Sequence, residues 1–156
     1  MNFIKSILFG IIVLTISALT SLDSIAQTKG EKGIGLMIGD PTGVTFKSWT
    51  SSKTAFDLGA AWSLEGTGGI SIHGDHLWHS WFDVNQGNFA FYYGIGARAR
   101  FIENEDSSIG VRIPLGVNYL FEEAPLDLFV EIAPIVDLIP DTDANGDGAI
   151  GIRYYF

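Results

Sequence analysis

An acidic stretch near the C-terminus has the spacing of a calcium-binding loop. Its oxygen-bearing side chains stand at every second position: Asp141, Asp143, Asn145 and Asp147. In a helix-loop-helix calcium site these positions supply ligands, and a bidentate Glu at position 12 completes the set. Position 12 is Ile152 here, which excludes that motif. Two interpretations remain, a looser calcium turn built from the four oxygens and a hairpin loop that turns at Asn145-Gly146, and we favour the hairpin.

A second group of reactive side chains lies in the stretch SIHGDHLWHSW. In a strand, His73, Asp75 and His79 share one face, where they could form a metal site or part of a lipid-modifying hydrolase. His73 and His79 are six residues apart, about 20 Å along a strand, which is too far to share one metal. No neighbouring segment offers an obvious nucleophile. We therefore expect no enzyme activity, and predict that these side chains pack and pair with Arg98 or Arg100.

Composition removes several other function classes. The chain has 156 residues, which favours one domain, and it contains no cysteine. Disulfides, thiolate metal sites and a cysteine nucleophile are therefore excluded. The net charge of −9 argues against nucleic acid as a partner, because no basic patch exists to neutralise phosphates. The stretches GIGLMIG and YYGIGARAR contain Gly-x-Gly, but neither opens a helix, so neither predicts a nucleotide loop.

The first residues have the pattern of a cleavable signal peptide. Lys5 supplies the positive region, and Ile7–Ala18 supplies an apolar run that is shorter than the roughly 20 residues of a membrane-spanning helix. Ser24 and Ala26 are small residues at the two positions that a signal peptidase reads, which predicts cleavage after Ala26. Residues 1–26 are therefore expected to be a signal peptide, and residues 27–156 the exported domain.

The exported part alternates apolar and polar residues with a period of two, which predicts strands. Eight strands are expected: Gly33–Gly39, Gly43–Thr50, Thr54–Leu64, Gly69–Phe82, Phe89–Ile102, Ser108–Phe121, Leu126–Leu138 and Gly148–Phe156. The short links between them join antiparallel neighbours, since a parallel pair needs a crossover of about a dozen residues. An even number of antiparallel strands with no covering helix favours an up-and-down barrel. Pro114 and Pro134 predict a break or bulge within two strands.

The polar faces of these strands favour a barrel with a polar interior and apolar side chains toward lipid. They carry many glycines, which weaken a water-facing strand but suit the crowded inside of a small barrel. Their charges are balanced, with Lys47, Arg98, Arg100, Arg112 and Arg153 against Asp57, Asp75, Asp127, Glu131 and Asp137. Such groups can pair within one lumen, whereas unpaired buried charges are costly. Trp49, Trp62, Trp78 and Trp81 are expected at the membrane interface.

The last strand carries the most specific motif. Its apolar face ends on an aromatic residue at the carboxylate: Ile150, Ile152, Tyr154 and Phe156. In this feature, and in architecture along the whole exported part, the chain resembles the small eight-stranded outer-membrane barrels of Gram-negative bacteria. The resemblance implies an all-β, antiparallel, transmembrane β-barrel in the cell outer membrane. It also implies that Phe156 helps the barrel-assembly machinery to recognise the chain.

The sequence thus predicts a non-enzymatic, monomeric outer-membrane barrel with a filled polar lumen and a structural or surface-interaction role. Eight strands enclose too little space for an open pore. Its partners would be outer-membrane lipids and lipopolysaccharide, and its only candidate cofactor is calcium at the Asp141–Asp147 loop. Two alternatives stay open: a secreted lipocalin-like carrier of a small apolar ligand, and a lipid-modifying barrel enzyme.

Overall fold

The computed structural model describes residues 31–62, 69–103 and 106–156. These residues form nine strands: β1 (Lys32–Asp40), β2 (Thr42–Trp49), β3 (Thr54–Trp62), β4 (Gly69–Asp83), β5 (Asn88–Ile102), β6 (Ser108–Arg112), β7 (Leu115–Leu120), β8 (Leu126–Ile139) and β9 (Asp143–Tyr155). The predicted signal peptide, residues 1–26, lies outside the described residues. No helix within the described ranges is long and apolar enough to cross a membrane.

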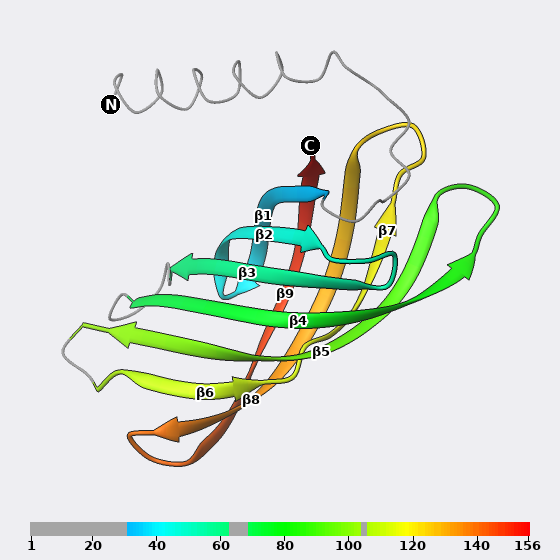
Figure 1. Cartoon of the computed structure of the whole chain (residues 1–156). Helices are drawn as coiled ribbons and strands as arrows, with labels where there is room; N and C mark the ends of the chain where they lie inside the picture. The colour runs from blue at the N-terminus through cyan, green and yellow to red at the C-terminus, as the bar shows by residue number, and fades with distance from the viewer. Residues whose placement is uncertain (1–30, 63–68, 104–105) are drawn as a thin grey trace, which may run out of the picture.

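The strands close into one antiparallel ring (Figure 1). Apart from β6 and β7, which do not pair with each other, each strand pairs with its neighbour in sequence, and β9 returns to pair with β1, with Ile34 opposite Tyr154. The short strands β6 and β7 follow one another and together fill a single place between β5 and β8. The ring therefore has eight places, as the sequence predicts.

Proline interrupts the ring at one of the two predicted positions. β6 ends at Arg112 and β7 begins at Leu115, so Pro114 lies in the break between them. The register on β8 is the same on both sides, because Ile113 N donates to Pro134 O at 3.0 Å and keeps the strands aligned. The prediction of a second break at Pro134 is wrong, since β8 runs through it.

The last hairpin differs from the prediction. β9 begins at Asp143, and Asn145 and Gly146 pair with Ile135 and Pro134 of β8. The prediction of a hairpin loop at Asn145-Gly146 is therefore wrong, and the chain turns over residues 140–142 instead. Polar residues that read as a loop are strand residues here, because the long partner strand β8 supplies their ladder bonds.

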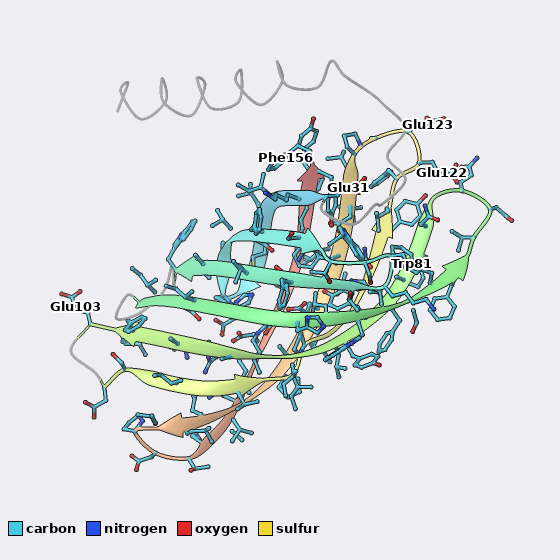
Figure 2. The ribbon with its side chains drawn as sticks, in the orientation of Figure 1. Glu31, Trp81, Glu103, Glu122, Glu123 and Phe156 are labelled. Atoms are coloured by element: carbon cyan, nitrogen blue, oxygen red, sulfur yellow. The ribbon has the colours of Figure 1, made fainter. Side chains whose placement is uncertain are left out.

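The two faces of the wall have opposite chemistry, and this confirms the predicted sidedness. Val111 and Val130 point outward with 36% and 49% of their surfaces exposed, whereas their neighbours Arg112 and Glu131 are 3% and 7% exposed. The same alternation holds along the long strands: apolar side chains cover the outside, and polar side chains are buried inside (Figure 2). The strands thus bury their ion-paired side chains and expose most of their aliphatic side chains.

The two ends of the barrel differ in what they carry. Figure 2 places Phe156, Glu122 and Glu123 at one end and Glu103 at the other. The first end holds both barrel termini, where Phe156 N donates to Lys32 O at 2.9 Å. We call it the terminal end, and the opposite one the Glu103 end.

The tryptophans follow the predicted interface pattern only in part. Trp62 and Trp78 are exposed on the outer surface. Trp49 is only 1% exposed, packs with Ala55 and Tyr155 inside the terminal end, and stacks on Trp81 at 5.7 Å. An interface position for Trp49 is therefore wrong, because its strand parity directs it into the lumen.

Candidate functional site

The barrel interior is the candidate site, and Arg112 lies at its centre. From β6 its guanidinium reaches Asp75 on β4, and its Nη2 donates to Glu131 Oε1 on β8 at 2.5 Å. Tyr92 of β5 donates its hydroxyl to the other Glu131 oxygen at 2.8 Å. Four strands are therefore connected across the lumen by side chains that are almost fully buried.

A second cluster around Arg98 lies nearer the Glu103 end. Arg98 pairs with Asp137 of β8 and with Asp147 of β9, each at 3.0 Å. Its Nη2 also donates to Asn145 Oδ1 at 2.8 Å, and the Asn145 amide donates to Asp137 at 2.7 Å. Asp147 Oδ2 lies 3.6 Å from Arg112 Nε, which links this cluster to the central one.

A third cluster, around Arg153 of β9, fills the terminal half of the lumen. Arg153 pairs with Asp57 at 2.5 Å and lies 3.6 Å from Asp127. Its guanidinium stacks over the Phe129 ring, 3.8 Å from the centroid. Thr45 donates its hydroxyl to Asp57 at 3.0 Å. This cation is thus held by two carboxylates and one aromatic face.

Lys47 is held differently, by a histidine and two aromatic rings. Its Nζ lies 2.8 Å from His79 Nε2, 4.6 Å from the Trp49 ring centroid and 5.2 Å from that of Tyr92. His79 Nδ1 lies 3.3 Å from Lys53 O and donates to it, so Nε2 is the acceptor for the Lys47 ammonium. His79 is therefore a structural partner of a buried cation, in an arrangement that leaves no free base.

The predicted pairing of His73 and Asp75 with Arg98 or Arg100 is wrong. Asp75 pairs with Arg112, and Arg98 is occupied by β8 and β9. The strand twist carries long side chains across the lumen, past the adjacent strand. Arg100 is half-buried and takes part in none of the ion pairs among the described residues. His73, Asp75 and His79 do share the lumen face, but Asp75 pairs with Arg112, His79 contacts Lys47, and the His73 ring packs over Gly59.

Asp147 is the lumen residue that the sequence pattern did not assign to the interior. With it, the ionic clusters of the described interior hold six carboxylates and four lysine or arginine side chains: Asp57, Asp75, Asp127, Glu131, Asp137 and Asp147 with Lys47, Arg98, Arg112 and Arg153. Arg100, of the same parity as Arg98, is half-buried and lies outside these clusters. The predicted five-to-five balance is therefore wrong. Extending the inward parity of Arg153 back along β9 would have found Asp147, because the two are six residues apart.

The candidate calcium ligands are separated by the strand. Asp143 is exposed at the start of β9, and Asp141 is exposed in the turn before it. Asn145 and Asp147 point inward and bind Arg98. Within the described part of the chain, no three His, Cys, Asp or Glu side chains are grouped to hold a metal. Calcium binding by this segment stays a prediction.

Glycine makes room for the buried histidine, which yields a test of the packing. A Cβ added to Gly59 would collide with the His73 ring. We expect Gly59→Val to lower the free energy of unfolding by about 1–3 kcal/mol through overpacking. Gly74→Val is the matched control on the outer face, where the nearest atom is a mobile Leu58 methyl at 3.1 Å. Urea unfolding in vesicles would measure the stability of both variants. Equal losses of stability would contradict the close packing of the His73 ring over Gly59.

Comparisons with known proteins give the fold an independent check. No family model matches the chain, and no curated protein matches it in sequence. Among solved structures, the N-terminal β-barrel domain of Pseudomonas aeruginosa OprF matches with a TM-score of 0.69 and 14% identity, over 83% of this chain and 100% of that one. Neisserial surface protein A (NspA) matches with a TM-score of 0.53 and 13% identity, over 81% of this chain and 94% of that one. The chain therefore has the fold of the small eight-stranded outer-membrane barrels.

Proposed function

We propose that the protein is an outer-membrane β-barrel with a structural or surface-interaction role and no enzymatic activity. The observation that supports this most strongly is the sidedness of the wall. Ile72, Ile95 and Val130 are about half exposed on the outside, while Arg112 and Arg153 are almost completely buried. In water this arrangement would be unfavourable, because it exposes apolar surface and buries charge. In a bilayer the apolar surface contacts lipid, and the charged side chains pair with one another inside the barrel.

The filled interior favours the interpretation of a closed barrel and argues against an open channel. Arg98, Arg112 and Arg153 reach across the lumen to carboxylates on other strands, so charged side chains occupy the axis. Barrels of eight strands leave an interior just wide enough for side chains. The same filling argues against the lipocalin-like carrier, which needs an apolar cavity for its ligand. The lipid-modifying alternative lacks support too, because His73 is buried in the lumen and His79 Nε2 is occupied by the Lys47 ammonium.

The terminal end would face the periplasm. Single-chain outer-membrane barrels have short periplasmic turns, and residues 50–53, 84–87 and 121–125 are compatible with such turns, although residues 41 and 140–142 form equally short turns at the Glu103 end. The Glu103 end would then face the lipopolysaccharide, with the apolar belt in contact with membrane lipid. Export would depend on residues 1–26, removed after Ala26, and the barrel would act as a monomer.

Fractionation tests this proposal. The protein is expected in the outer-membrane fraction, with an unheated sample that migrates differently on a gel from a boiled one. Intact-mass measurement should show a chain that begins at Gln27. Recovery in the soluble periplasm, with identical migration before and after boiling, would reject the proposal.

The terminal aromatic residue gives a second test, of the proposed assembly partner. Phe156 is 67% exposed, and its backbone bonds to Lys32 place it at the rim of the closed barrel. We expect deletion of Phe156 to reduce assembled protein in cells severalfold while folding into pure lipid vesicles stays unchanged. Phe156→Tyr, which keeps the aromatic ring, is the control. Equal loss in cells and vesicles would show that Phe156 acts on stability and not on recognition.

A further inference from the structure

A cleft of about 450 Å³ lies at the rim of the terminal end. It is lined by Lys53, Trp78, His79, Ser80, Trp81 and Tyr93. Trp78, Ser80 and Tyr93 come from the outward faces of β4 and β5, and Lys53 comes from the turn between β2 and β3. The cleft therefore joins the apolar outer wall to the polar rim.

The turn that carries Lys53 is fixed to the neighbouring strand. The Trp81 indole donates to Ser52 O at 2.7 Å, and His79 N donates to Lys53 O at 2.7 Å. Ser51 Oγ accepts from Lys53 N at 3.2 Å and from Thr54 N at 3.1 Å. The Lys53 backbone is thus held in place, while its side chain is exposed at the cleft.

The aromatic wall of the cleft suits the boundary between headgroups and acyl chains. Trp78 and Tyr93 stack with their centroids 5.7 Å apart and their planes at 24°. Amphipathic aromatic rings concentrate at membrane interfaces, and lysine side chains extend from there to the headgroups. The wall would lie against the glycerol and first methylenes of a lipid, beside a cation at headgroup height.

The positive charge of Lys53 at the cleft favours a lipid with an anionic headgroup. The protein carries a net charge of −9, and Lys47, Arg98, Arg112 and Arg153 are buried in the lumen. Lys53 is exposed and takes part in none of the ion pairs among the described residues. Ser80, also exposed, adds a hydroxyl donor to the same cleft. A cation and a hydroxyl beside an aromatic wall complement a phosphate that carries acyl chains.

We propose that this cleft binds the headgroup phosphate of an anionic phospholipid of the periplasmic leaflet, with Lys53 and Ser80 contacting the phosphate and Trp78 and Tyr93 the glycerol and acyl chains. The site rests on the proposed function, because it needs the terminal end at the periplasmic interface. It adds a specific lipid to the nonspecific belt that any barrel of this kind has.

Lipid retention tests the site. The protein would be folded into vesicles of phosphatidylcholine with one-tenth phosphatidylglycerol, extracted in mild detergent, and its bound lipid quantified by mass spectrometry. We expect phosphatidylglycerol to be enriched on the unaltered chain, and Lys53→Gln to reduce that enrichment about fivefold, the contribution of one lysine near anionic lipid. Lys53→Arg should retain it. Lys32→Gln, the matched control, removes another exposed lysine at the same end.

Further measurements distinguish a lipid phosphate from free phosphate as the ligand, and distinguish failure of the site from failure of the proposed function. Titration of the detergent-solubilised protein with inorganic phosphate should give no heat at millimolar concentration, and saturable binding would overturn the lipid as occupant. Equal enrichment on the unaltered chain and on Lys53→Gln would overturn the site while heat-modifiable migration in vesicles still supported the barrel. If no variant enters vesicles, the proposed function fails and the site falls with it.

Discussion

Replacing Arg112 by Ala is expected to lower the free energy of unfolding by about 3–5 kcal/mol, the cost of breaking a buried ion pair from one side. Asp75 and Glu131 both lose their main partner, and both are buried where water cannot replace it. Urea unfolding in lipid vesicles, followed by tryptophan fluorescence or by the folded band on a gel, would measure the loss.

Two companion variants define what the Arg112 result means. Arg100→Ala removes a half-buried arginine without an ion pair among the described residues, and should change stability by no more than about 0.5 kcal/mol. Adding Asp75→Asn and Glu131→Gln to Arg112→Ala should recover part of the loss, because neutral amides are less costly to bury than unpaired carboxylates. Equal losses at Arg112 and Arg100 would contradict the central role of Arg112.

Replacing Val130 by Arg is expected to make the free energy of folding into a bilayer less favourable by about 2–4 kcal/mol, the cost of a lipid-facing cation near the midplane. Val130 lies well inside β8, between buried Phe129 and Glu131, and is 49% exposed on the outer wall. Val130→Leu keeps the apolar surface and serves as the control. In vesicles the Arg variant should fold less and the Leu variant normally; indistinguishable variants would mean that Val130 does not face lipid.

The sequence predicts the sheet and its sidedness because both depend on local alternation. Exposed apolar residues stand at one parity of the strands and the buried charged residues at the other, so the pattern at Val111-Arg112 and Val130-Glu131 already identifies the two faces. The break at Pro114 is equally local, since proline cannot donate a ladder bond, but the same rule failed at Pro134, where β8 continues.

The contacts inside the barrel could not be predicted in the same way. Which carboxylate meets Arg112 depends on the stagger of strands that are neighbours only after the ring closes. The alternation places Asp75 inside but cannot show that it pairs with β6 and not with β5. Arg98 likewise pairs with Asp137 and Asp147, whose strands lie far along the chain.

The prediction of the C-terminal hairpin turn was wrong for a different reason. Asn, Asp and Gly around Asn145-Gly146 have strong turn preferences, and local preference favoured a loop there. The structure places them in β9 because β8 offers an equally long partner strand, and a paired ladder outweighs a weak local preference. Asp147 became a lumen residue by the same extension. Trp49 similarly follows its strand parity and not the usual place of tryptophan.

Quenching by brominated lipids tests most directly which face of the barrel wall touches lipid. Two variants would each keep one tryptophan, Trp62 or Trp49, with the other three replaced by Phe. Trp62, 45% exposed outside, should be strongly quenched in brominated vesicles, whereas Trp49, 1% exposed inside, should be nearly unaffected. Quenching of Trp49 as strong as that of Trp62, or no quenching of either, would contradict an apolar exterior around an ion-paired lumen.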